Sequence, residues 1–313
     1  MNKTVILSEA KDLVNGREIL RLWLRMTVLI FPLLFPASAH AAKLKVVASF
    51  SIIGDMVHEV AGHDIELKPL VGPNGDAHVY EATPGDAKAV AAADLVIING
   101  LGFEGWLPRL VESSGYKGPV VTATKGISPL GFSNDGLTQD PHAWQNLANG
   151  RIYVANIRDA LVKANPAHAA DYKTNAKQYL KQIDDLDRWV KKEIAQVSAG
   201  KRKVITSHDA FQYFARDYGV EFIAPMGIST ESEASAGDIA RLIDQMRTQK
   251  IRTLFMENIS DPRLIRQLQS DGGAVIGGTL YSDALSAPDG PAGTYLDMFR
   301  HNVGELVKGM SAN

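Results

Sequence analysis

From residue 44 onward, short apolar runs alternate with longer stretches in which apolar residues recur every three or four positions. The first four runs are expected to be strands, at Leu44–Ser49, Ile65–Val71, Asp94–Asn99 and Pro119–Thr122. The third is apolar almost without interruption, which is typical of a parallel strand buried on both faces. Helices are expected over Ile52–Val60 and from Pro84, which follows an N-cap at Thr83. This half of the chain is therefore predicted to be an α/β lobe with a mostly parallel sheet.

The same alternation starts again after residue 200 and predicts a second α/β lobe. The strands expected there are Lys203–Thr206, Val220–Ala224, Arg252–Met256 and Ala274–Ile276. The helices between and after them are expected at about 209–218, 236–249, 261–270 and 292–309. We expect an N-terminal lobe over residues 43–150, a helical segment over 151–199 and a C-terminal lobe over 200–313.

The segment between the two lobes predicts one long helix. No glycine or proline occurs from Ala167 to Ala199, whereas Asn165-Pro166 forms a start signal and Gly200 a stop signal. Its apolar residues have helical spacing, at Tyr172, Ala176, Tyr179, Ile183, Leu186, Val190, Ile194 and Val197. Two helices broken near Asp184-Asp185 are the alternative. A single helix would be a stiff strut that bridges the lobes and limits how far they can close.

The N-terminal segment, residues 1–42, has the pattern of a secretory signal. An apolar run over 27–35 is too short to span a bilayer, Arg21 and Arg25 precede it, and the small residues 37–42 follow. Cleavage is expected after Ala39 or Ala41, with a signal anchor as the alternative. The first twenty residues do not fit a normal signal, so we interpret the start as placed too far upstream. The mature chain is expected to be periplasmic and, with no cysteine, not lipidated.

Composition narrows the classes of function. A hydrophobic content of 45% and a charged content of 22% describe an ordinary globular protein, expected to be a monomer. Without residues 1–42 the chain has 28 basic and 32 acidic side chains, a formal charge of −4. No basic patch supports a nucleic-acid partner. The lack of cysteine excludes thiolate metal sites and disulfides.

Four polar residues stand out in separate short motifs, at intervals of 64, 66 and 75 residues: His78, His142, His208 and Asp283. Each lies beside a turn or at the end of a predicted strand, and open α/β sheets bind ligands at the carboxyl ends of their strands. Taken singly, each also fits an ordinary loop, turn or capping residue. Together, three imidazoles and a carboxylate would form a closed set of ligands for zinc or manganese.

Several motifs in order resemble the metal-binding proteins of bacterial zinc/manganese ABC importers. They are Val46–Asp55, Gly75–Glu81 with Thr83-Pro84, Asn99–Leu107, Asp140–Trp144, Thr206–Phe211 and Leu280–Asp283. The resemblance covers nearly the whole chain after residue 42. It implies two α/β lobes joined by a long helix, with a metal held between them by His78, His142, His208 and Asp283. It also implies delivery to an ABC permease and leaves open whether a periplasmic metallochaperone loads the site.

The resemblance favours zinc over manganese. In this family the third ligand is His in zinc binders and often Glu in manganese binders, and here it is His208. However, many zinc members carry a histidine-rich loop after the first ligand, and residues 125–139 contain no histidine. Because three imidazoles must be neutral to bind, affinity is expected to fall steeply below about pH 6.

Glu257 also ends a predicted strand, and we expect it to accept a hydrogen bond from an imidazole N–H of the site. The alternative function is a secreted metal-dependent hydrolase with an open zinc site, in which Glu257 would be the general base. No His-Glu-x-x-His motif supports it, and four protein ligands leave no position for a catalytic water. A surface adhesin is a third possibility without an anchor. We therefore expect a transport protein with no catalytic residues.

Overall fold

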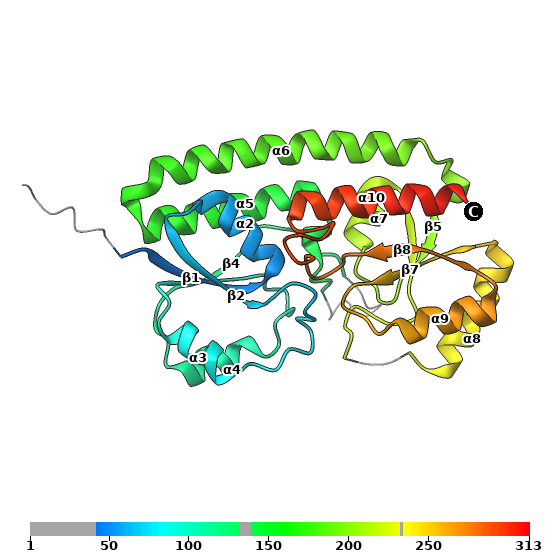
Figure 1. Ribbon diagram of the computed structural model, residues 1–313, viewed down its shortest axis with the longest axis horizontal. Helices are drawn as coiled ribbons and strands as arrows, with labels where there is room; N and C mark the ends of the chain where they lie inside the picture. The colour runs from blue at the N-terminus through cyan, green and yellow to red at the C-terminus, as the bar shows by residue number, and fades with distance from the viewer. Residues whose placement is uncertain (1–41, 132–138, 232–233) are drawn as a thin grey trace, which may run out of the picture. The chain divides into compact units, whose positions relative to one another are not determined.

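Two four-stranded sheets, both entirely parallel, form the framework of the protein (Figure 1). The structure is a computed structural model that describes residues 42–131, 139–231 and 234–313. The predicted signal region, residues 1–42, lies outside them apart from Ala42. Residues Lys43–Asn313 form a single unit in which both sheets lie. Within the described ranges, no helix has both the length and the apolar character needed to cross a bilayer.

All eight predicted strands are present. Their ends shift by at most one residue, except that the last strand continues to Leu280 instead of ending at Ile276. The first sheet has the order β2-β1-β3-β4, made of Ile65–Val71, Leu44–Phe50, Leu95–Ile98 and Val120–Thr122. The second has the order β6-β5-β7-β8, made of Glu221–Ile223, Lys203–Ile205, Thr253–Glu257 and Val275–Leu280. The prediction of two parallel α/β lobes is confirmed.

Helices cover both faces of each sheet (Figure 1). The first sheet packs against α2 (Ser51–Ala61) on one face, and against α3 (Pro84–Ala91) and α4 (Leu107–Ser114) on the other. The second packs against α8 (Ala236–Gln249) and α9 (Pro262–Gly272) on one face. Its other face packs against α10 (Tyr295–Ser311), and α7 (Gln212–Tyr218) follows β5 in the chain.

The predicted cap of α3 is present. The hydroxyl of Thr83 accepts a hydrogen bond from the amide of Asp86, and the Asp86 carboxylate accepts one from the amide of Thr83. Pro84 takes the first helical position, where its missing N–H costs nothing. This reciprocal cap starts the helix six residues after His78 and so determines where the loop that carries His78 ends.

The long helix is α6 (Ala169–Ala195), and it runs without a break through Asp184-Asp185. The two-helix alternative is therefore wrong. A 3₁₀ turn at Pro166–His168 replaces the first predicted turn, and the helix ends before residue 199. Its 27 residues span about 40 Å at 1.5 Å per residue. All eight predicted apolar positions, from Tyr172 to Val197, are buried.

That apolar face of α6 holds the two halves of the molecule together. It packs against α2, α10 and α5 (Leu147–Ala164), so one hydrophobic core runs through both lobes. The start of α5 was not predicted, because Gly150 lies within its first turn. A Cβ at Gly150 would lie 2.7 Å from the hydroxyl oxygen of Tyr295 in α10, so glycine is needed for close packing.

Candidate metal centre

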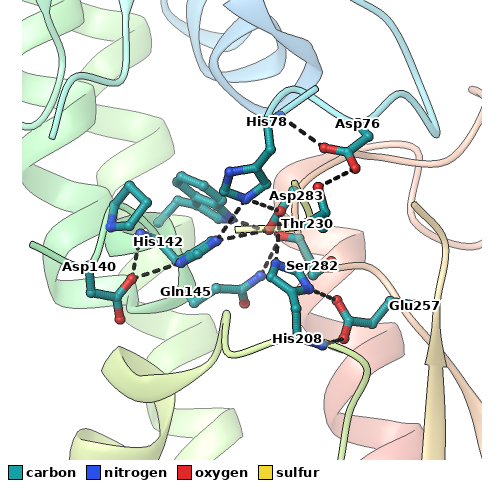
Figure 2. Close-up of polar contacts among 12 residues, drawn as sticks. Asp76, His78, Asp140, His142, Gln145, His208, Thr230, Glu257, Ser282 and Asp283 are labelled. Carbon is teal, nitrogen blue, oxygen red and sulfur yellow. Dashed lines mark hydrogen bonds and ion pairs between the residues drawn. The ribbon is translucent and has the colours of Figure 1, made fainter. Parts of the chain in front are cut away.

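The four candidate ligands, far apart in the sequence, meet at one point (Figure 2). His78 lies in the loop after β2, His142 precedes the 3₁₀ turn Ala143–Gln145, His208 follows β5, and Asp283 follows β8. One nitrogen or oxygen atom of each lies within 4.8 Å of those of the others. His142, His208 and Asp283 are 0% exposed and His78 is 8% exposed. The site is thus a buried cluster built from both halves of the chain.

The Nε2 atoms of all three histidines face the Asp283 carboxylate. Those of His78 and His208 each lie 3.1 Å from Asp283 Oδ2. The Nε2 of His142 lies 3.7 Å from Asp283 Oδ1 and 3.3 Å from the Nε2 of His78. Three nitrogens and a carboxylate therefore point inward, each from a different segment.

The ring of His142 is oriented by Asp140, two residues earlier in the chain. One oxygen of Asp140, Oδ1, lies 2.7 Å from His142 Nδ1 and also accepts a hydrogen bond from the His142 amide at 2.9 Å. An acceptor at Nδ1 favours the tautomer with its proton there, which leaves the lone pair of Nε2 directed inward. The sequence analysis missed this role, although the spacing Asp-Pro-His could have indicated it.

Glu257 lies against His208 on the side away from Asp283. Its Oε2 is 2.6 Å from His208 Nδ1, an ion-pair contact without the alignment of a regular hydrogen bond. Its Oε1 accepts hydrogen bonds from the amides of Ser207 and His208, at 2.7 and 2.9 Å. Figure 2 shows the contacts between Glu257, at the end of β7, and His208. Glu257 thus lies behind one imidazole of the site, where the expected hydrogen bond from the ring is replaced by this ion-pair contact.

The loop that carries His78 is joined to the other half of the chain through Asp76. Asp76 Oδ1 accepts a hydrogen bond from the His78 amide at 2.9 Å, and Oδ2 accepts one from the Thr230 hydroxyl at 2.6 Å. The indole N–H of Trp106 donates to the Ala77 carbonyl at 2.8 Å. Asp76 and Thr230 lie 154 residues apart, so the sequence offered no signal for this contact.

Hydrogen bonds to the backbone of the preceding residue, Ser282, fix the position of Asp283. The Ser282 carbonyl accepts hydrogen bonds from the Trp144 indole at 2.9 Å and from the Gln145 side chain at 2.6 Å. Asp283 is completely buried, yet its Oδ1 has no hydrogen-bond partner among the described residues. A buried carboxylate oxygen without a donor is costly unless a cation or proton neutralises it. These residues therefore suit a cation in their midst.

The pKa values of the site reflect this concentration of charge. Burial alone would raise the pKa of Asp283, but the charges of His208 and His142 hold it well below its usual value. Burial would likewise lower the pKa of His142, but Asp283 and Asp140 raise it to about 9. The pKa of His208 lies well above its usual value, because Glu257 and Asp283 outweigh the effect of burial. Without a metal, the positive charges of protonated His142 and His208 therefore balance the negative charges of the carboxylates.

The aromatic residues near the site and the remaining described histidines differ in their exposure. Phe103 and Trp144 are buried beside the site, and Trp106 is partly buried. His58 and His63 are exposed. His168 and His301 are partly buried, and each has an oxygen atom beside one ring nitrogen. His168 Nδ1 lies 3.2 Å from an Asp64 oxygen, and His301 Nε2 lies 2.9 Å from the Thr279 carbonyl.

Comparisons with known proteins identify the family of this chain. Residues 46–309 match the family described as zinc-uptake complex component A, periplasmic. The chain is 35% identical over 269 residues to the manganese-binding lipoprotein MntA of Halalkalibacterium halodurans, covering 86% of this chain and 89% of that protein. It is 34% identical over 274 residues to the iron-binding protein YfeA of Yersinia pestis, covering 87% and 88%.

Solved structures with a similar fold belong to metal-binding proteins. The periplasmic zinc-binding protein TroA of Treponema pallidum is 32% identical, with a TM-score of 0.82, covering 86% of this chain and 99% of that one. A manganese-bound periplasmic metal-binding protein from Candidatus Liberibacter asiaticus is 35% identical, with a TM-score of 0.78, covering 86% and 100%. The chain therefore belongs to this family of extracytoplasmic metal-binding proteins, which are the substrate-binding components of ABC importers and not enzymes.

Proposed function

We propose that this protein captures one divalent transition metal ion in the periplasm through His78, His142, His208 and Asp283, and delivers it to its ABC permease. The observation that carries the proposal is the meeting of these four side chains within 4.8 Å in a buried cluster. The unpaired Oδ1 of Asp283 supports a cation as the ligand. Asp140 and Glu257 hold two of the imidazoles in the orientation that metal binding needs.

Zinc is the proposed cargo, with manganese as the competitor. Three imidazole nitrogens and one carboxylate suit zinc, and zinc binds such donors more tightly than manganese does. The names of similar proteins are divided: MntA is named a manganese-binding protein, YfeA an iron-binding protein and TroA a zinc-binding protein. A titration must therefore compare these metals directly.

Release is proposed to follow from separation of the lobes. The four ligands come from segments on both sides of α6, so a small displacement of one sheet against the other would remove ligands from the ion. Such a movement would have to break the hydrogen bond between Asn258 Nδ2 and Asn74 Oδ1, which are 3.1 Å apart, and the one between Thr230 and Asp76. The chain has no cysteine, so a single pair introduced at Asn74 and Asn258 can form only one intramolecular disulfide.

The cross-linked variant tests this release step. We expect Asn74→Cys/Asn258→Cys to bind metal when oxidised but to fail to support uptake through its permease until it is reduced. The single variants Asn74→Cys and Asn258→Cys are the controls and should support uptake in both states. Uptake by the oxidised double variant at the wild-type rate would disprove lobe separation.

The location of the protein in the cell envelope has its own test. The sequence contains no cysteine that could carry a lipid, although several similar proteins are named lipoproteins, among them MntA. We propose a monomer that is free in the periplasm and leave its loading by a metallochaperone open. Fractionation and the intact mass of the exported protein decide between a free and a lipid-bearing form.

A hydrolytic function finds no support in the geometry. Glu257 would have to be free to accept a proton from a metal-bound water, yet both of its oxygens are engaged, by two amides and by His208 Nδ1. Four protein ligands also leave no open position on a tetrahedral ion.

The proposal is tested by elemental analysis of the purified protein, followed by calorimetric titration of zinc and manganese into the metal-stripped protein. One equivalent of zinc bound tightly is expected. His208→Ala should weaken zinc binding far more than His168→Ala, because His168 lies on the surface at the start of α6. Equal effects of the two substitutions, or the absence of stoichiometric metal, would refute the four-ligand site.

A further inference from the structure

A cavity of about 410 Å³ leads from the surface to the metal centre. It is lined by Leu101, Gly102, Phe103 and Gly105, by Gln139 and Pro141, and by Ile228, Ser229 and Glu231 from the other half of the chain. Of the four candidate ligands, all of which are described, only His78 lines it. The same residue is the one ligand with measurable exposure, 8% against 0% for the other three. An ion from solvent would therefore meet His78 first.

The charge along this cavity is uneven. Of the described residues that line it, Glu231 is the one with a carboxylate, and its side chain is exposed. Leu101, Phe103 and Ile228 provide apolar wall, and the Phe103 ring lies edge-on to His78 with ring centroids 4.8 Å apart. Low-dielectric walls concentrate the field of a charge into the water between them. A single negative charge at the mouth would thus raise the local concentration of divalent cations.

Contacts across the mouth hold this carboxylate near the loop that carries His78. Thr230, next to Glu231, donates to Asp76, and Asp76 accepts from the His78 amide (Figure 2). The Glu231 amide donates to the Ser229 hydroxyl at 3.2 Å. Within the described part of the chain, no hydrogen bond or ion pair engages the Glu231 carboxylate itself. It is therefore available to attract a mobile cation.

We propose that the metal ion reaches the site through this cavity, guided by the Glu231 carboxylate and received first by His78. This inference rests on the proposed function and adds its route and a residue that sets the rate of capture. Glu231 does not contact the ion in its final position, because it does not belong to the buried cluster. Its long-range field acts about equally on the ion in the cavity and on the bound ion, so its effect should fall mainly on the association rate constant.

The size of the effect follows from electrostatics. A single charge about 10 Å from a divalent ion in water changes the association rate about three-fold at ~10 mM salt, and hardly at all at ~0.5 M. Glu231→Gln should therefore slow association about three-fold at low salt, and Glu231→Lys about ten-fold. Glu112→Gln removes an equally exposed carboxylate from α4, away from the cavity, and is the matched control.

The experiment is stopped-flow mixing of zinc with the metal-stripped full chain, followed by tryptophan fluorescence at several salt concentrations. Trp144 reports on the site, because its ring centroid lies 5.2 Å from that of His142. The expected result is a slower, salt-dependent association for the Glu231 variants only. Equal rates for wild type and Glu231→Gln at low salt, or equal slowing by Glu112→Gln, would overturn the inference. Wild-type protein that takes up no stoichiometric zinc would instead refute the proposed function.

Discussion

Replacement of Glu257 by glutamine should reverse the tautomer of His208. In the wild type, Glu257 Oε1 accepts hydrogen bonds from two backbone amides, and Oε2 faces His208 Nδ1. Glutamine must keep its oxygen toward the two amides, because its NH₂ group cannot accept hydrogen bonds. The NH₂ group then faces Nδ1, which must act as the acceptor. In the neutral ring the proton then moves to Nε2, which lies 3.1 Å from Asp283 Oδ2. Metal binding needs this nitrogen unprotonated.

The expected cost is a 10- to 100-fold loss of zinc affinity, about 1.4 to 2.8 kcal/mol. Asp140→Asn provides an internal comparison on His142. Asp140 Oδ1 accepts hydrogen bonds from both the amide and the Nδ1 of His142. Its other oxygen, Oδ2, has no hydrogen-bond partner among the described residues. Asparagine can therefore keep the acceptor in place, and its effect should be clearly smaller than that of Glu257→Gln.

Competition against a chromophoric zinc chelator at pH 6.5 and pH 8.5 measures both variants. Glu257 contributes to the raised pKa of His208, so its removal also weakens proton competition. The loss of affinity in Glu257→Gln should therefore be larger at pH 8.5 than at pH 6.5. Thermal unfolding of the metal-free variants verifies that they are folded. Affinity of Glu257→Gln within two-fold of the wild type at both pH values would refute the tautomer argument.

Three further predictions concern the site and its support. Because the metal must displace a proton from His142, whose pKa is about 9, zinc affinity should keep rising above pH 7, by up to about ten-fold per pH unit per displaced proton. For the metal-free protein the sign is opposite: stability from this raised pKa is complete below about pH 6.5 and is lost as the pH rises through 9. Thermal unfolding with and without zinc, at several pH values, measures the zinc affinity and the stability of the metal-free protein. A zinc affinity that does not change with pH above 7 would contradict the argument. Gly150→Ala should lower the free energy of unfolding, measured in urea, by about 1 to 3 kcal/mol, because its Cβ would lie 2.7 Å from the Tyr295 hydroxyl. An unchanged free energy of unfolding would show that α10 can shift to make room for the methyl group. Ile183→Ala, at a fully buried position of α6, should cost about 2 to 5 kcal/mol, whereas the exposed Gln182→Ala should cost little, and both lobes should unfold in one transition.

The elements that could be predicted are those whose pattern is local. The β-strands and α6 follow from apolar periodicity, because burial on one or both faces acts on neighbouring residues in the chain. The strand expected at Ala274–Ile276 is longer in the structure, because β8 continues through Gly277 and Gly278 to Leu280. In the structure a Cβ at Gly277 would lie 2.6 Å from a methyl group of Thr253 in β7, so glycine serves close packing within the strand.

The sequence by itself determined which donors are available: three histidines and one aspartate, each beside the end of a strand or a turn, and the Asp-Pro-His spacing that orients one ring. Only the tertiary structure decided that their atoms lie within 4.8 Å of one another. The two sheets present their carboxyl-end loops toward a common point, and the core along α6 holds them there. Likewise, Glu257 meets His208 across 49 residues and Thr230 meets Asp76 across 154. The raised pKa values depend on this proximity and burial, because charge interactions depend on distance and solvent exposure, which the order of residues does not contain.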